Sequence, residues 1–363
     1  KRNCQLKYPQ TQLPIIKLLY ISSQCSPKGF HRMNFHIHKP VEYEKIIADQ
    51  NPSNIELTRH RMAVQQLLDA GDNHDMLVSR LQKYIECFDK VCLHLDPTKK
   101  LHKQPYFHWV VDSKGISSSC WKFEGVIARA LLSSLLQKSA NVKLSSGKYI
   151  AASKDYKRAS DQHKQAVATL QSWKWKLPSV NHPIIQTNWH VSMVHHLKSL
   201  QDLCMLCIGF EKETNSNTMY TVAQRSTKSA ATSIAFWPDK PSNLKLCQYM
   251  QARLSSDILW ERQEYGASIH RLQNDLAHNK VETFGFKCLQ NEIDKIPFLL
   301  KEREQVNNGA YFDPVKAHTP LPTPEELIRT GPTDVPHPQN TRNSLEEPVP
   351  TEEHAQEQPF STQ

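Results

Sequence analysis

Glycine is scarce in this chain, with only 10 of 363 residues, roughly a third of average usage. Folds that need glycine at many tight turns, such as doubly wound nucleotide-binding sheets, propellers and hairpin-rich sandwiches, are therefore disfavoured. Long apolar runs are missing as well. A membrane-spanning helix needs about 18 apolar residues in succession, and the longest candidate, at 13–21, is interrupted by Pro14 and Lys17. We therefore expect no membrane-spanning helix.

Acidic residues are unevenly distributed. Residues 1–32 contain six bases and no acid, whereas residues 319–363 contain eight acids and two bases. These segments carry +6 and −6, so residues 33–318 carry the whole net charge of +9. A modest positive excess favours acidic partners or an anionic surface. No run of five Lys or Arg residues occurs, so the sequence predicts no nucleic-acid partner.

Motifs of catalysis and of phosphate binding are also missing. The sequence contains no G-x-S-x-G, G-x-G-x-x-G, G-x-x-x-x-G-K-[ST] or H-E-x-x-H, which removes the commonest nucleophile, nucleotide and zinc signatures. Cys204 and Cys207 form a C-x-x-C inside an apolar helical stretch without a second pair at zinc-site spacing, so we expect them in the core. His195 and His196 point about 100° apart on a helix and cannot bind one ion from one face. Nine cysteines without a secretory pattern predict reduced thiols. We expect no catalytic residues, no metal and no cofactor; the chain is not predicted to be an enzyme.

Helical periodicity is what the sequence does contain. Apolar residues recur at intervals of three and four over most of residues 53–305, which predicts an all-α fold. The clearest stripes lie at 77–95 and 149–173, and further ones at 120–138, 188–208, 218–236, 243–260, 264–277 and 281–304. The stripes are wide, which is typical of helices packed on both sides, as in the stacked helix pairs of a tetratricopeptide-like solenoid. Residues 97–117 lack such a stripe, and we predict at most a short N-proximal strand pair near 105–112.

Three segments follow from these patterns. Residues 33–318 form the helical domain, and residues 319–363, with nine Pro and the single aromatic Phe360, are expected to be a disordered acidic tail. Residues 1–32 form an atypical basic segment with two interpretations. One is a targeting peptide, since such peptides are basic and poor in acids. The other is sequence that precedes a native start at Met33.

Several segments, in chain order over roughly 35–325, resemble the Bro-one domain family, which includes ALIX, BROX and rhophilin, and most closely a stand-alone BROX-like domain. They are Phe107-His-Trp109-Val-Val-Asp112 followed by Phe123-Glu124, the helix from Tyr156 to Trp173, Leu197 to Leu206, Tyr265-Gly266-Ala-Ser-Ile269-His-Arg271-Leu272-Gln273, and Asn307 to Phe312. The Tyr-Gly-x-x-Ile-x-Arg-Leu-Gln block and the collinear order carry the resemblance. The family's Phe-Asn pair in the helix after Phe123-Glu124 is here Ala130-Leu131.

The resemblance implies an elongated, banana-shaped helical domain that acts as a non-enzymatic adaptor of the endosomal sorting (ESCRT) system. Its partner would be the amphipathic C-terminal helix of an ESCRT-III subunit, a charged multivesicular body protein, seated in an apolar groove. The resemblance places Met205, Val222 and Arg225 at this partner-binding groove, with Cys204 and Thr221 as weaker apolar fillers. It also implies a cytoplasmic, endosome-associated location and transient contact with an anionic membrane surface. The alternative hypothesis is a divergent Bro-one-like scaffold or cytoskeletal interaction protein that has lost ESCRT-III binding.

Overall fold

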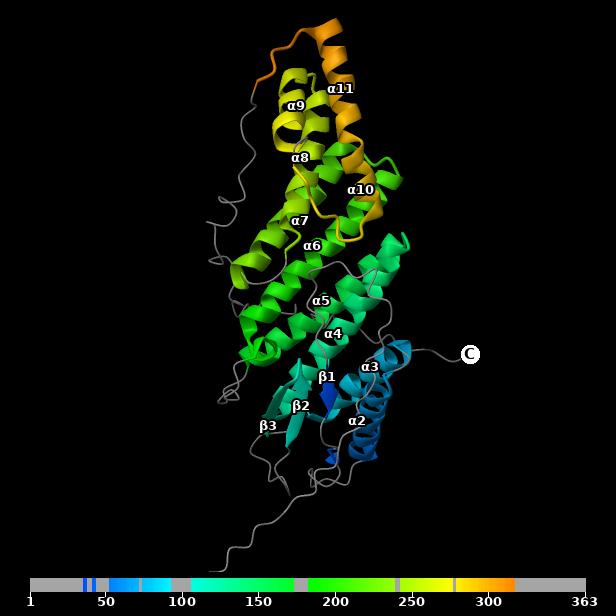
Figure 1. The fold of residues 1–363 in the computed structure, drawn as a ribbon. Helices are drawn as coiled ribbons and strands as arrows, with labels where there is room; N and C mark the ends of the chain where they lie inside the picture. Colours follow the sequence, from blue (N-terminus) through cyan, green and yellow to red (C-terminus); the bar gives the residue numbers. More distant parts are fainter. Residues whose placement is uncertain are drawn as a thin grey trace, which may run out of the picture. The chain divides into compact units, whose positions relative to one another are not determined.

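A computed structural model of the chain describes residues 35–37, 41–43, 52–71, 74–92, 106–172, 182–238, 242–276 and 279–316. All of them belong to one compact unit, and it is built almost entirely of helices (Figure 1). The all-α prediction is therefore confirmed. The predictions for residues 1–32 and 319–363 lie outside the described residues. Among the helices of the described ranges, none combines the length and apolar character that a bilayer crossing requires.

The elements follow one another along the chain as Figure 1 labels them. The first part contains β1 (Phe35–Ile37), α2 (Pro52–Ala70), α3 (His74–Cys92), β2 (Phe107–Val111) and β3 (Lys114–Ser118). The second part contains α4 (Trp121–Ser145), α5 (Tyr149–Gln171), the 3-10 turn η2 (Pro183–Ile185), α6 (Thr187–Glu211), α7 (Ser216–Phe236) and α8 (Leu244–Glu261). The last part contains α9 (Tyr265–Arg271), the π-helical turn η3 (Leu272–Leu276), α10 (Lys287–Asp294), α11 (Ile296–Val306) and the π-helical turn η4 (Asn307–Tyr311).

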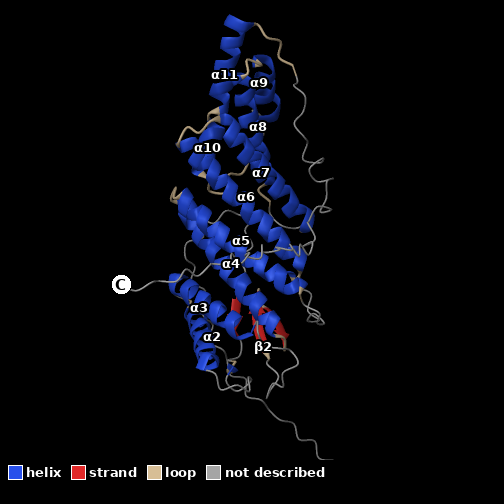
Figure 2. Ribbon diagram, turned by 180° about the vertical axis from the view of Figure 1, so that it is seen from behind, coloured by secondary structure: helices blue, strands red, loops and turns tan. Residues whose placement is uncertain are grey.

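The strands form one small antiparallel sheet in the order β1-β2-β3, gathered beside α4 (Figure 2). Side chains of β2 alternate between buried and half-buried, which is the period-two pattern of a sheet with one packed face. The turn residues Asp112 and Ser113 have φ values of 50° and 65°, as a tight two-residue hairpin turn demands. The predicted strand pair is therefore found at 107–118. β1 was not predicted, because three residues are too few for an alternating pattern to be recognised.

A buried carboxylate joins the sheet to the first helices. Glu124, fully buried in the first turn of α4, accepts hydrogen bonds from Arg61 Nε of α2 at 2.9 Å, Tyr84 Oη of α3 at 2.7 Å and Trp109 Nε1 of β2 at 2.6 Å. Tyr84 Oη also lies 2.7 Å from Tyr43 Oη, just after β1. A charge so far from water is tolerated only when it is paired and hydrogen-bonded. Three separate elements thus converge on one side chain of α4.

From α4 to α8 each helix packs on the next one in the chain. Serine hydroxyls mark two of these seams, α4–α5 once and α6–α7 twice. Ser133 Oγ of α4 donates to the Ala159 carbonyl of α5, Ser192 Oγ of α6 donates to the Ser233 carbonyl of α7, and Ser226 Oγ of α7 donates to the Ser199 carbonyl of α6 (3.0, 2.8 and 3.1 Å). Small side chains let helix backbones approach closely, and a hydroxyl that bonds across the seam fixes their register.

Two buried imidazoles connect α5 to α6 and η2. His190 Nε2 donates to the Ile184 carbonyl at 2.8 Å, so in neutral His190 the other nitrogen, Nδ1, accepts the bond from His163 Nδ1 at 2.8 Å. Burial lowers the pKa of His190 to about 4, although the bond to Ile184 opposes the shift. A neutral His190 suits this arrangement, because protonation would turn its Nδ1 into a donor that faces the Nδ1–H of His163.

The expected helix at 281–304 is wrong in its first part. Phe284 and Gly285 have φ values of 50° and 85°, outside the right-handed helical region, and residues 279–286 form no helix. α10 begins only at Lys287, and a separate helix, α11, follows with Pro297 in its first turn. Proline is favoured there because its missing N–H has no helical acceptor in any case. The apolar spacing at Val281 and Phe284 therefore belongs to a loop that packs on the core.

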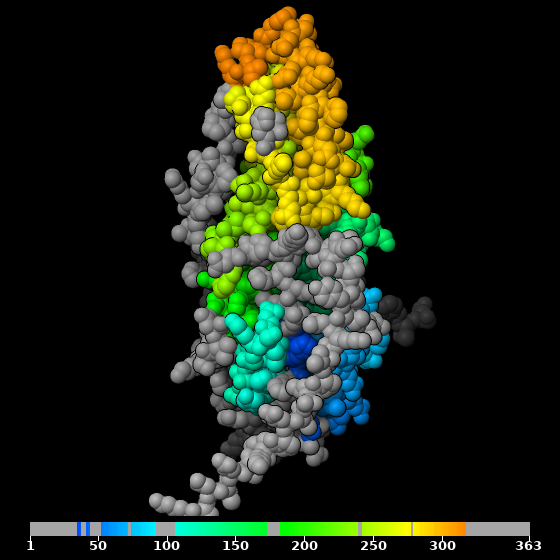
Figure 3. Space-filling model, viewed as in Figure 1, coloured from blue at the N-terminus to red at the C-terminus, as the bar shows by residue number. Residues whose placement is uncertain are grey.

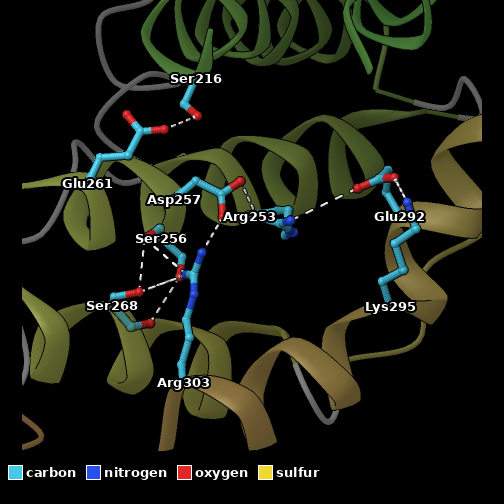
Figure 4. A network of polar contacts seen from close by, with 9 residues as sticks. All are labelled: Ser216, Arg253, Ser256, Asp257, Glu261, Ser268, Glu292, Lys295 and Arg303. Atoms are coloured by element: carbon cyan, nitrogen blue, oxygen red, sulfur yellow. Dashed lines mark hydrogen bonds and ion pairs between the residues drawn. The ribbon is translucent and has the colours of Figure 1, made fainter. Parts of the chain in front are cut away.

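The last helices are fastened to α8 by arginine. Figure 3 shows the orange residues of α10 and α11 packed against the yellow residues around 265–286. Beneath them, Arg303 of α11 donates through Nη1 to Ser256 Oγ and Ser268 Oγ (2.7 and 2.8 Å) and through Nη2 to Asp257 Oδ1 (2.6 Å) (Figure 4). The ring of Trp260 lies 4.9 Å from the guanidinium carbon, within cation–π range. Arg303 therefore ties α11 to both α8 and α9.

The first prediction concerns Glu124. Replacing it with Gln should lower the free energy of unfolding by about 3 kcal/mol, because Arg61 is left as an uncompensated buried cation. Urea unfolding followed by far-ultraviolet circular dichroism measures the change. The matched control is Glu261→Gln, whose side chain is exposed and bonds Ser216; it should stay within about 0.5 kcal/mol of the parent. Equal midpoints for the two variants would contradict the role of Glu124.

The second prediction concerns pH. An unfolded histidine titrates near 6.5, whereas His190 in the folded chain has a pKa of about 4. Between these values the unfolded state binds more protons, so stability falls as the pH falls. The parent should lose up to about 3 kcal/mol more than His190→Gln between pH 6.5 and 4. Gln retains a donor for Ile184 and an acceptor for His163. His60→Gln, on partly exposed α2, should keep the full pH dependence; parallel curves for parent and His190→Gln would refute the assignment.

Candidate partner-binding face

One exposed stripe of α6 lies between α5 and α7. Its positions recur at helical spacing and comprise Val191, Val194, Lys198, Gln201, Met205 and Ile208, all exposed or half-buried. The two flanks of this stripe are occupied. Ser160 Oγ of α5 bonds the Val194 carbonyl on one side, and Ser226 Oγ of α7 bonds the Ser199 carbonyl on the other. The stripe therefore lies between the contacts that α6 makes with α5 and those that it makes with α7.

α10 contacts α5 and α6 away from this stripe. The Cys288 backbone N–H donates to Tyr149 Oη of α5 at 3.2 Å, and Cys288 Sγ contacts the Cys207 carbonyl of α6 at 3.7 Å. The exposed stripe of α6 lies on the other side of this helix, between α5 and α7. We call this side, together with the adjoining sides of α5 and α7, the α5–α6–α7 face. Its residues come from 150–158, 198–208 and 218–228.

An apolar row crosses this face. The pairs Ser160–Val194 and His163–His190 set α5 against α6, and continuing this antiparallel pairing by two to three turns brings Ile150 level with Met205. In the same way, the bond between Asp202 and Arg225 sets Met205 level with Val222. Ile150 is 56% exposed and Met205 44%, whereas Val222 is half-buried and packs on the core. We call Ile150, Met205 and Val222 the apolar row.

Positive charge surrounds this row. In the three stretches of the face the exposed bases are Lys154, Lys157, Arg158, Lys198, Arg225 and Lys228, and no acid is exposed. Lys157, Lys198 and Lys228 stand two helical turns from the apolar row, about 10 Å along the helices. We call them the basic row. A surface with one sign of charge beside apolar side chains attracts ligands of the opposite sign.

An ion pair lies between the two rows. Asp202 of α6 is buried, and Arg225 of α7 donates to it through Nε (3.1 and 3.0 Å to the two carboxylate oxygens) and Nη2 (2.6 Å). Half of the Arg225 side chain is exposed, 49%, against 5% for Asp202. These hydrogen bonds raise the pKa of Arg225 above its ordinary value. The carboxylate thus holds a permanently charged guanidinium at the seam while half of the arginine side chain remains in solvent.

The three residues predicted for the groove, Met205, Val222 and Arg225, thus lie on one seam. The weaker fillers behave differently: Thr221 is exposed, whereas Cys204 is fully buried and does not reach the face. Sequence reasoning missed Ile150 and the basic row. The signal for Ile150 was available, because it is an isolated apolar residue on the polar side of an amphipathic helix. The basic row had no signal, since it depends on the register between helices.

The other candidates lie in the core. Cys204 and Cys207 are fully buried, as predicted, and burial raises the pKa of Cys204 to about 12, which keeps it a neutral thiol. His196 is buried, and half-buried His195 stacks on Phe236 with ring centroids 6.3 Å apart. Across the described ranges, no group of three or more His, Cys, Asp or Glu residues is arranged to hold a metal ion.

Comparison with known proteins gives matches in structure alone. No protein-family model matches the chain, and no curated protein matches it in sequence. The structure is similar to that of the ALIX BRO1 domain in its complex with CHMP4C, with a TM-score of 0.59 and 13% identity over 79% of this chain and 90% of that one. It is also similar to ALIX in complex with the SIVmac239 PYKEVTEDL late domain, with a TM-score of 0.64 and 14% identity over 86% of this chain and 50% of that one. The chain therefore has the fold of a BRO1-type domain.

Proposed function

We propose that the chain is a non-enzymatic adaptor that binds an acidic amphipathic helix on the α5–α6–α7 face, and that this helix is the C-terminal segment of an ESCRT-III subunit. The observation that carries the proposal is the apolar row with exposed bases beside it and no exposed acid. Helix-in-groove recognition needs this combination, because apolar anchors supply affinity and opposite charge supplies steering. The location that follows is cytoplasmic and endosome-associated.

The structural comparison supports the same partner class. A solved complex joins the ALIX BRO1 domain to CHMP4C, and this chain shares the fold of that domain. The local chemistry of the face agrees with such a partner. Met205 is an exposed, flexible apolar side chain, of the kind that adapts to the side chains of a bound helix. Lys198 and Lys228 lie where acidic residues of that helix would be met.

One observation favours the second candidate, a BRO1-type scaffold that has exchanged its partner. Arg225 places a charge in the seam where the resemblance implies an apolar groove residue, and Cys204 faces the core. Such changes reduce the apolar area offered to a helix. The two candidates differ in one measurement: the scaffold would not bind ESCRT-III helices at micromolar concentration.

The test is a titration with a fluorescein-labelled peptide of the C-terminal helix of CHMP4C, followed by anisotropy. Met205→Ser should weaken binding about 30-fold, because burying a methionine side chain is worth about 2 kcal/mol. The matched control is Met62→Ser on α2, since Met62 is 43% exposed and Met205 44%. Binding that is unchanged in Met205→Ser, or equally weakened in Met62→Ser, would refute the proposal that the helix binds on the α5–α6–α7 face. A parent that does not bind the peptide would favour the scaffold.

Val222→Asp is the harsher version of the same test. Val222 packs partly on the core, so an aspartate there must be desolvated at a cost of a few kcal/mol. We expect peptide binding to fall about 100-fold, with a lower thermal midpoint than in Met205→Ser. Affinity and thermal unfolding are measured on one sample. A folded variant with unchanged affinity would show that the helix docks elsewhere.

A further inference from the structure

The ion pair between Asp202 and Arg225 leaves part of the Arg225 guanidinium unused. Arg225 uses Nε and Nη2 on the buried carboxylate. Within the part of the chain that the structure describes, its third nitrogen, Nη1, makes no hydrogen bond, and half of the side chain is exposed. An arginine normally loses rotamer freedom when it binds a ligand. Here Asp202 has already removed that freedom, so a partner carboxylate meets a pre-positioned donor edge.

The position of Arg225 on the face is equally specific. It stands three residues, or about one helical turn, beyond Val222 of the apolar row. Lys198 and Lys228 of the basic row stand a further turn away. A bound helix that runs along α6 repeats its contacts every 5.4 Å. It would therefore place an apolar residue on the apolar row, its next turn over Arg225, and the turn after that over the basic row.

We infer that Arg225, positioned by Asp202, selects a partner helix with an acidic residue one turn from its apolar anchor. The inference rests on the proposed function and adds the order of residues that the face recognises. A carboxylate is selected over an amide because Arg225 offers only donors and a fixed charge. Asp202 is not displaced. It stays buried on the inner edge of the guanidinium while the partner occupies the outer edge.

Lys228 is the control for Arg225, because it represents an ordinary surface charge. It is exposed on the same helix, one turn beyond Arg225, but lacks a buried carboxylate partner among the described contacts. A lysine is a mobile point charge and gives steering with little selectivity. Arg225 and Lys228 should therefore contribute differently, although each adds one positive charge to the face.

The experiment uses synthetic fluorescein-labelled amphipathic peptides with a leucine anchor and glutamates one and two turns from it. Each peptide is made with the glutamates on the N-terminal or the C-terminal side of the leucine, because the face does not fix the helix direction. Each glutamate is replaced by Gln in turn. Affinity is measured for the parent chain and for Arg225→Gln, Arg225→Lys, Asp202→Asn and Lys228→Gln, and thermal unfolding verifies that each variant is folded.

With the parent, losing the first-turn glutamate should weaken binding about fivefold, a typical size for one well-placed charge pair. In Arg225→Gln the same peptide change should have no further effect. Asp202→Asn should abolish most of this selectivity, measured as the ratio of affinities for the Glu and Gln peptides, which a purely structural brace would not do. Arg225→Lys should restore the charge but less than half of the selectivity. In Lys228→Gln, losing the second-turn glutamate should have no further effect, whereas losing the first-turn glutamate should still weaken binding.

Two negative results have different meanings. If Met205→Ser abolishes binding but no peptide glutamate couples to Arg225, the helix docks on the face without using Arg225. The inference then falls while the proposed function stands. If no peptide binds the parent, the proposed function falls and takes the inference with it. Equal coupling of both glutamates to Arg225 and Lys228 would also overturn the inference, because unspecific charge would then explain the preference.

Discussion

The fold depends on one charge that cannot reach water. The Glu124 carboxylate is fully buried, and its acceptor sites are filled by Arg61, Tyr84 and Trp109. Because an unpaired buried charge costs several kcal/mol, α2, α3 and β2 have to meet at the start of α4 with all three donors in place. The positive end of the α4 dipole favours the carboxylate at this position. The direction of α4 is therefore fixed, and α5 and the helices after it are added to a fixed support.

Further along the chain, serine hydroxyls help to set the register between neighbouring helices. Ser192 and Ser233 bond each other across α6 and α7, and Ser226 bonds the Ser199 carbonyl. The buried side of α7 consists mostly of Ala, Ser and Thr, and such small side chains permit close packing of the two helices. The consequence for the face is direct. A shift of α7 by one turn would move Val222 away from Met205, so the apolar row depends on the register that these hydroxyls and the Asp202–Arg225 ion pair hold.

The sequence predicted most helices because one stripe of apolar residues per helix is buried, and this spacing is visible without tertiary information. It could not predict the loop at 279–286, where backbone geometry at Phe284 and Gly285 overrides an apolar pattern. The need for glycine at position 266 could not be predicted from the sequence either. A Cβ there would lie 2.0 Å from the Pro314 carbonyl oxygen, a constraint set 48 residues away. The face was predictable only at the positions that the resemblance named. Ile150, Asp202 and the basic row depend on how three helices align.

Two arginine–carboxylate pairs in this chain differ in how far the arginine is exposed to solvent. Arg61 and Glu124 are 1% and 0% exposed, so no ligand can approach either, and the pair serves only to hold elements together. Asp202 is also buried, but half of Arg225 reaches solvent. Burial of the acid alone keeps the guanidinium oriented, while exposure of the base leaves its outer edge in contact with water that a partner can displace. The same chemical pair thus acts as a brace when both ends are buried and as a positioned charge when one end is open.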